Sequence, residues 1–247
     1  MNLNLATIRL SRHRKPSNSG FSLIELMVTV AILLMVMAGV FGEVGKLQKV
    51  SRDEDLKREL FQNAREFMDQ FARDAHASGS PNVRQYSIGG AALPDTDQRI
   101  AVGLVKISSN EIIFEGDVHG DGLVDDVGYR YAAAVAGYSC PCLQRSEINK
   151  ANVSPTAQNV APNYYVALEN VLAPTANTPV FSFYDVSGVQ VNSAGTAIDI
   201  STTTDAATIA KIRSVRVFIN VQASTPDLQL ARRTASSLTQ EVRFNNY

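Results

Sequence analysis

The sequence predicts an α+β protein in which one long N-terminal helix packs on an antiparallel β-sheet. Two observations carry this prediction. No proline occurs between Phe21 and Ser80, and the apolar residues of this stretch follow a helical period. The rest of the chain alternates short apolar runs with clusters of Gly, Pro, Asn and Ser, which is typical of strands and turns. A helix with an apolar stripe needs a surface to cover it, and a half-buried sheet supplies one.

The first part of this helix is apolar enough to cross a membrane. Residues 21–41 carry a single charged side chain, Glu25, and a helix of that length spans about 30 Å of hydrocarbon. The residues before this segment include four bases and no acid. These bases are Arg9, Arg12, Arg14 and Lys15. The charge asymmetry predicts that the N-terminus lies in the cytoplasm and the bulk of the chain outside.

A cleaved secretory signal and a plain signal anchor are two common explanations of such an apolar segment, and each disagrees with one feature of the sequence. A cleaved secretory signal has a shorter apolar core followed by a small-residue cleavage site, whereas this apolar run is long and a charged stretch follows it. A plain signal anchor gives no reason for Glu25, whose burial in lipid costs about 2.5–3.5 kcal/mol. The carboxylate of Glu25 therefore calls for a partner.

Residues 19–28, SGFSLIELMV, resemble the processing site of type IV prepilins and type II secretion pseudopilins. In that family a prepilin peptidase cleaves after the glycine and the new N-terminal phenylalanine is methylated, which the resemblance assigns to Gly20 and Phe21. The family's assembly glutamate corresponds to Glu25. A physical reason supports this role, because the α-ammonium of a neighbouring subunit's Phe21 would neutralise Glu25 in a low dielectric and set the subunit register.

The resemblance implies a pilin-like division of the chain into four parts. Residues 1–20 are a cleaved basic leader, 21–42 the transmembrane and assembly helix, 43–78 the amphipathic half of the helix, and 79–247 a periplasmic β-rich domain. Cleavage changes the net charge from −1 to −5, because it leaves 19 bases against 24 acids. This acidic balance argues against a nucleic-acid partner.

The second half of the helix carries an apolar stripe at spacings of 4, 3, 4 and 4 residues. The stripe consists of Leu60, Ala64, Phe67, Phe71 and Ala75, and residues 79–81, Gly-Ser-Pro, end the helix. Many major pilins have a proline where this chain has Gly42, and glycines recur here at Gly39, Gly42 and Gly45. Two interpretations remain open: the glycines let the helix bend during assembly, or they allow close helix contacts.

The remaining chain predicts seven short strands and one surface loop. The strands are expected at residues 100–107, 111–115, 123–132, 164–171, 180–184, 215–221 and 238–244. Residues 191–207 are rich in Ser, Thr, Ala and Asp and predict a loop or insertion.

An acidic, glycine-rich segment at residues 116–126 suggests a hairpin turn and a calcium site. The turn prediction rests on Gly120-Asp121-Gly122. Calcium ligands would be Asp117, Asp121, Asp125 and Asp126, because hard cations prefer several oxygen ligands. The match to a calcium loop is partial, since His119 stands at its third position and Gly128 at its twelfth.

The chain offers no recognisable catalytic motif, and apart from calcium it predicts no cofactor. Cys140 and Cys142 are expected to form a disulfide in an oxidising periplasm, although a bridge over two residues is tight. His76 and His119 stand outside any nucleophile or metal motif. A non-enzymatic structural role follows.

The resemblance implies a minor type IV pilin of the PilW type that helps to initiate or cap pilus assembly. Its partners would be other pilin or pseudopilin subunits, the prepilin peptidase and an inner-membrane assembly platform. The protein would first be a single-pass inner-membrane protein with its C-terminal domain in the periplasm, and then part of a filament. The alternatives are a type II secretion minor pseudopilin, an adhesin module delivered by a pilin helix, and a membrane-anchored enzyme.

Overall fold

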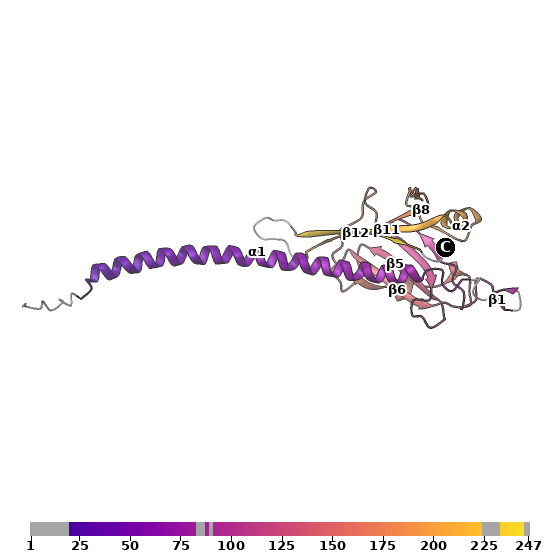
Figure 1. The fold of residues 1–247 in the computed structure, drawn as a ribbon, viewed down its shortest axis with the longest axis horizontal. Helices are drawn as coiled ribbons and strands as arrows, with labels where there is room; N and C mark the ends of the chain where they lie inside the picture. The colour runs from indigo at the N-terminus through magenta and orange to yellow at the C-terminus, as the bar shows by residue number, and fades with distance from the viewer. Residues whose placement is uncertain (1–19, 83–86, 89–90, 224–232, 245–247) are drawn as a thin grey trace, which may run out of the picture. The chain divides into compact units, whose positions relative to one another are not determined.

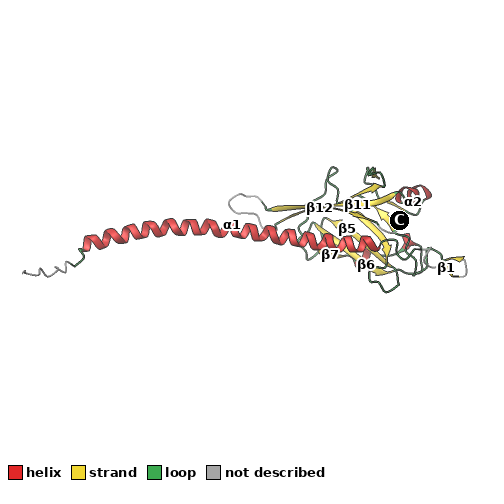
Figure 2. Cartoon of the chain, in the orientation of Figure 1, coloured by secondary structure: helices red, strands yellow, loops and turns green. Residues whose placement is uncertain are grey.

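The computed structural model describes residues 20–82, 87–88, 91–223 and 233–244. The predicted leader therefore lies outside the described residues except for Gly20. The chain divides into two compact units, Met1–Ser51 and Arg52–Tyr247, and each is described by itself. Helix α1 (Leu23–Ala77) supplies the regular structure of the first unit and the first element of the second (Figure 2).

The second unit contains two larger antiparallel sheets and a small hairpin (Figure 1). The hairpin pairs β1 (Ser87–Ile88) with β2 (Ala91–Ala92). The six-stranded sheet has the order β10-β3-β4-β5-β6-β7, with β10 (Ile198–Asp199), β3 (Leu104–Ile107), β4 (Glu111–Gly116), β5 (Asp125–Ala132), β6 (Cys142–Asn149) and β7 (Tyr165–Leu168). The four-stranded sheet has the order β12-β11-β8-β9, with β12 (Ala235–Arg243), β11 (Ile212–Gln222), β8 (Phe181–Asp185) and β9 (Gln190–Val191). The predicted α+β class, a long helix with antiparallel sheet, is confirmed.

The apolar stripe of α1 packs into the core between these sheets. Phe71 has no exposed surface, and its ring contacts Tyr129 of β5 at 5.0 Å and Phe181 of β8 at 5.8 Å between centroids. Ala64, Phe67 and Ala75 are buried as the helical period predicts, and Leu60 packs at the margin. Both sheets therefore pack their inner faces against the same apolar stripe of α1.

A buried polar cluster fixes the helix against β5 and β6. The Oδ2 atom of Asp74, whose residue is 3% exposed, accepts hydrogen bonds from Tyr129 Oη at 2.6 Å and Arg145 Nε at 2.8 Å. Gln70 on the preceding turn donates to Asp74 Oδ1 at 2.7 Å, and Arg145 also pairs with Glu147. Burial and the neighbouring carboxylate of Asp74 raise the pKa of Tyr129, which keeps the phenol a donor.

Just beyond the C-terminal end of α1, the chain contacts β4 through backbone groups. Ser78 forms a β-bridge with Gly116, and Gly79 N donates to Glu115 O at 2.9 Å. A Cβ on Gly116 would lie 2.4 Å from the carbonyl oxygen of Ala77. Only glycine fits where the helix end meets the strand.

Some elements differ from the sequence-based expectations, among them the short strands β1, β2 and β9, which were not predicted. Strand β6 was not predicted, because Gln144, Arg145 and Ser146 break the apolar alternation although all three are buried. The segment predicted as a loop at 191–207 contains β10 and the start of helix α2 (Thr203–Ile209). Thr202 caps α2 by accepting a hydrogen bond from Asp205 N at 3.1 Å.

Replacing Asp74 by alanine is expected to destabilise the second unit strongly. The substitution leaves Arg145 and Tyr129 without their shared acceptor in a buried site, and breaking a buried ion pair costs about 3–5 kcal/mol. Urea unfolding of the full chain in detergent, followed by tyrosine fluorescence, measures the change. Asp69→Ala is the control, because Asp69 lies on the same helix in an exposed i to i+4 pair with Arg65 at 3.9 Å. Equal midpoints for the two variants would contradict a structural role for the cluster.

Candidate processing and assembly site

The bond between Gly20 and Phe21 lies in an accessible, non-helical segment. Both residues are exposed, Phe21 by 79%, and α1 begins two residues later at Leu23. The carbonyl of Ser22 accepts the first helical hydrogen bonds, from Glu25 N at 3.0 Å and Leu26 N at 3.1 Å. The bond therefore lies outside the helix, at residues that are exposed and that a peptidase can reach.

The first turns of α1 present apolar side chains in every direction. The most apolar 18-residue window of the helix has a mean hydropathy of 2.5 and no buried residue, so by length and composition the helix can cross a membrane. The glycines Gly39, Gly42 and Gly45 lie within this continuous helix, and apart from the helix's own nearby backbone no described atom lies within 4 Å of an added Cβ. Their surface is open to a neighbour, while the bending interpretation is not tested.

Glu25 is an exposed acid in the first turn of α1. Among the residues that the structure describes, its carboxylate has no hydrogen bond or ion pair, whereas Glu43 farther along the helix pairs with Lys46 at 2.8 Å. A carboxylate at the helix N-terminus interacts favourably with the helix dipole, but this does not replace a counter-ion in lipid. The geometry leaves Glu25 available to a cation from another chain.

The comparisons with known proteins bear on this segment. Residues 15–41 match the family model described as the prokaryotic N-terminal methylation motif. This match supports a type IV pilin or pseudopilin, and it points to a structural subunit that is processed by prepilin peptidase and assembles with other pilins. No curated protein and no solved structure matches the chain.

The acidic segment at residues 116–126 forms the predicted hairpin connection between β4 and β5, which pair from Glu111 with Arg130 to Gly116 with Asp125. Asp117 organises the turn, because its Oδ1 accepts from Gly120 N at 2.6 Å and its Oδ2 from Gly122 N at 2.9 Å. The positive φ angles of Gly120 and Gly122, 72° and 85°, suit glycine.

The four acids proposed as calcium ligands have separate surroundings. Asp121 accepts from the backbone of Leu123 at 2.9 Å, and Asp125 lies 3.0 Å from Nδ1 of His119. Asp126 follows Asp125 on the strand, so its side chain lies on the opposite face. Within the described residues no group of three or more His, Cys, Asp or Glu side chains is placed to hold a metal ion. Calcium binding here stays a prediction.

His119 links the turn to the neighbouring strands. Its Nδ1 lies 3.0 Å from Asp125 and its Nε2 lies 2.8 Å from Glu147 on β6. The hydrogen bond to Asp125 and the charge of Glu147 raise the pKa of His119. This arrangement stabilises the turn and involves no nucleophile.

A second buried charge cluster, which no sequence pattern predicted, lies beside this hairpin. Lys150 and Glu115 are both fully buried and form an ion pair of 2.7 Å, and Lys150 Nζ also donates to the carbonyl oxygens of Asp95 at 2.5 Å and Ile100 at 2.7 Å. Asp126, paired with Glu115 in the strand register, is buried, and among the described residues neither of its carboxylate oxygens has a hydrogen-bond partner. No sequence motif marks Lys150 and Glu115, because the two members of the ion pair lie 35 positions apart in the sequence.

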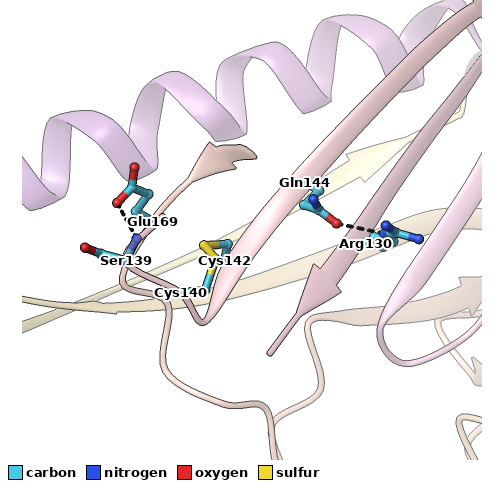
Figure 3. The surroundings of a disulfide bond; sticks show 6 residues. All are labelled: Arg130, Ser139, Cys140, Cys142, Gln144 and Glu169. Atoms are coloured by element: carbon cyan, nitrogen blue, oxygen red, sulfur yellow. Dashed lines mark hydrogen bonds between the residues drawn. A yellow bond between two sulfur atoms is a disulfide. The ribbon is translucent and has the colours of Figure 1, made fainter. Parts of the chain in front are cut away.

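Cys140 and Cys142 form a disulfide at the start of β6 (Figure 3). The loop before the strand is also held by the Glu169 carboxylate, which accepts from Ser139 N at 3.1 Å, and by Ser139 O, which accepts from Asn170 N at 3.0 Å. Figure 3 shows the disulfide lying between this contact and the Arg130–Gln144 hydrogen bond. The surroundings are those of a structural crosslink.

The burial of Asp126 predicts that the domain loses stability as the pH rises. Burial, reinforced by the charge of Glu115, raises the pKa of Asp126 from 3.8 to about 8. The unfolded chain releases this proton near pH 4 and the folded chain near pH 8, so the free energy of unfolding falls between these values, with a slope approaching about 1.4 kcal/mol per pH unit. Asp126→Asn should flatten this slope in urea unfolding series at pH 4–8, with Asp69→Asn as control. An unchanged slope would refute the proposed protonation.

Proposed function

We propose that this chain is a minor type IV pilin, a structural subunit that helps to initiate or cap pilus assembly. Prepilin peptidase cleaves it after Gly20 and the new N-terminus at Phe21 is methylated. The mature chain is a single-pass inner-membrane protein whose C-terminal domain lies in the periplasm until an assembly platform extracts it into a filament. Within the filament, Glu25 pairs with the α-ammonium of a neighbouring Phe21.

The observation that carries this proposal is the match of residues 15–41 to the methylation motif, at the start of a helix whose apolar side chains are exposed on all sides. A simple anchor needs the apolar surface but neither the exposed Gly20–Phe21 bond nor the acid at Glu25. A filament subunit needs all three, because the helix leaves lipid for a bundle of like helices.

The minor, PilW-type role is supported by the size and elaboration of the second unit. A chain of 247 residues carries ten strands in its two larger sheets, and the connections at residues 133–141 and 150–164 are long. Type II secretion pseudopilins share the methylation motif. An experiment must therefore distinguish a pilus from a secretion pseudopilus. Experiments must likewise test a role in adhesion and the binding of calcium at Asp117, Asp121, Asp125 and Asp126.

Substitution of the cleavage-site glycine should block processing. Gly20→Arg places a long charged side chain at the scissile bond, so the variant should keep its leader while the wild type begins at methylated Phe21. Intact-mass and N-terminal peptide mass spectrometry of membrane-extracted protein distinguishes the two. Gly42→Ala is the control, because it changes a glycine with open surroundings on the same helix and should leave processing unchanged. A wild-type chain that retains Met1 would refute the proposal.

Neutralising Glu25 should separate processing from assembly. Glu25→Gln removes the charge that pairs with the neighbouring N-terminus, and the expected result is a processed, methylated chain that stays in the membrane fraction. Filaments sheared from the cell surface are probed for the subunit, with Glu43→Gln as control because Glu43 lies outside the motif and pairs with Lys46. Incorporation of the Glu25 variant at the wild-type level would contradict its assembly role.

The same fractions distinguish the two kinds of filament. Recovery of the wild-type chain in sheared surface filaments supports the pilus assignment. Retention in the cell envelope, together with failure of protein secretion when the gene is deleted, would instead identify a type II secretion pseudopilin.

A further inference from the structure

The face of the four-stranded sheet that points away from the core is hollowed. On β11 the side chains of Val215, Val217, Ile219 and Val221 are buried inward, so Arg216 and Phe218 lie on the opposite face. A cavity of about 660 Å³ lies over that face, which is within the size range of sites that bind small ligands.

The floor of this hollow comes from three adjacent strands. Register places Arg216 opposite Ser182 of β8, and Phe218 opposite Thr239 of β12. The Arg216 guanidinium lies over the Tyr184 ring, 4.6 Å from its centroid, and donates to Tyr184 Oη at 3.1 Å. Half-buried Phe218 adds an aromatic surface beside them.

The walls of the hollow are tied in place before any ligand arrives. Ser109 N donates to Gly195 O at 3.1 Å, and Phe181 N donates to Ser109 O at 3.0 Å, so one wall is joined to β8. Gly195 has a φ of 68°, and an added Cβ would lie 3.0 Å from Ser109 Cβ. On the other wall Thr175 and Thr178 bridge each other through backbone and hydroxyl groups.

The lining has an unusual chemistry for a protein cavity. Hydroxyl and carboxamide side chains dominate it, among them Ser109, Thr175, Thr178, Ser182, Asn192 and Thr239. Within the described chain, Arg216 is the one charged residue of the lining, and Glu241 balances it at 3.2 Å. Groups that both donate and accept hydrogen bonds match a ligand whose own groups are hydroxyls.

We propose that this hollow binds a neutral oligosaccharide. Each sugar ring offers hydroxyls to the walls and an apolar C–H face to Phe218, while the compensated charge of Arg216 gives no advantage to an anionic sugar. A purely apolar ligand would leave the polar lining unsatisfied. The inference rests on the second unit alone, and it holds whether or not the chain enters a filament.

Saturation-transfer NMR on the full chain in detergent tests the proposal. The probes are lactose, maltotriose, cellotriose, triacetylchitotriose and mannotriose, with sialyllactose as the anionic partner of lactose and tetraserine as a neutral peptide. At least one neutral sugar should receive saturation from the protein. Sialyllactose should receive no more saturation than that sugar does. Absence of transfer to every neutral sugar, or transfer to the peptide or the anionic sugar alone, overturns the proposal.

Substitutions then locate the bound sugar. Phe218→Ala should weaken binding of the responding sugar about tenfold through loss of the aromatic contact, and Thr239→Val should weaken it through loss of one hydroxyl. Tyr138→Ala is the control, because Tyr138 is an exposed aromatic residue, 52% accessible, that does not line the hollow. If Thr239→Val and Phe218→Ala bind as the wild type does, the sugar lies elsewhere and the proposal fails.

A glycine pair tests the walls in the same assay. Gly195→Ala should weaken binding, because its new methyl group displaces Ser109. Gly188→Ala carries a comparable backbone strain, with a φ of 77°, but nothing lies within 4 Å of the added atom. Equal affinities for the two variants would show that the wall at Ser109 does not hold the sugar.

Discussion

The packing of Phe71 is the interaction on which the rest of the second unit depends. Its ring touches Tyr129 of the six-stranded sheet and Phe181 of the four-stranded sheet, so one helical side chain joins both sheets to α1. Neither sheet then needs to bury its second face, because the inner faces share the helix as a common cover. This arrangement leaves the outer face of the four-stranded sheet free, and there the hollow beside Arg216 and Phe218 lies.

Apolar contact alone does not define how the helix is rotated on the sheets. The cluster of Asp74, Tyr129 and Arg145 adds that definition, since a half-turn of the helix would remove the Asp74 carboxylate from its two buried donors, the Tyr129 hydroxyl and the Arg145 guanidinium. Lys150, the residue that follows β6, and Glu115 of β4 form a second buried ion pair. Such pairs contribute little net stability compared with apolar residues of equal size, but removing one member is costly.

Sequence reasoning predicted those features whose cause is local. The stripe from Leu60 to Ala75, the strands with regular alternation and the hairpin at Gly120-Asp121-Gly122 all carry their signal within a few residues. Strand β6 was not predicted because Arg145 is buried against a helix residue, Asp74, that lies 71 positions away, and no local pattern reveals such a contact. Helix α2 had a usable signal, the Thr202-x-x-Asp205 cap, that the Ser- and Thr-rich composition obscured. The methylation motif could be predicted from the sequence because it is one short contiguous segment, whereas the lining of the hollow is assembled from five separate stretches.

Under the proposed function, Glu25 supplies a directing interaction that the apolar side chains of the surrounding helix cannot. Lipid tails are about as apolar as the side chains of a neighbouring helix, so moving residues 21–42 from the membrane into a filament gains little hydrophobic free energy. Under the proposed function, the apolar surface therefore makes the transfer possible without directing it. A carboxylate without a counter-ion is disfavoured in lipid, and a neighbouring α-ammonium would relieve that penalty at one register only. Because this pairing also requires the amine that cleavage after Gly20 creates, an unprocessed chain would lack the cation it must offer to the next subunit. Processing and assembly would thus be coupled by a single ion pair.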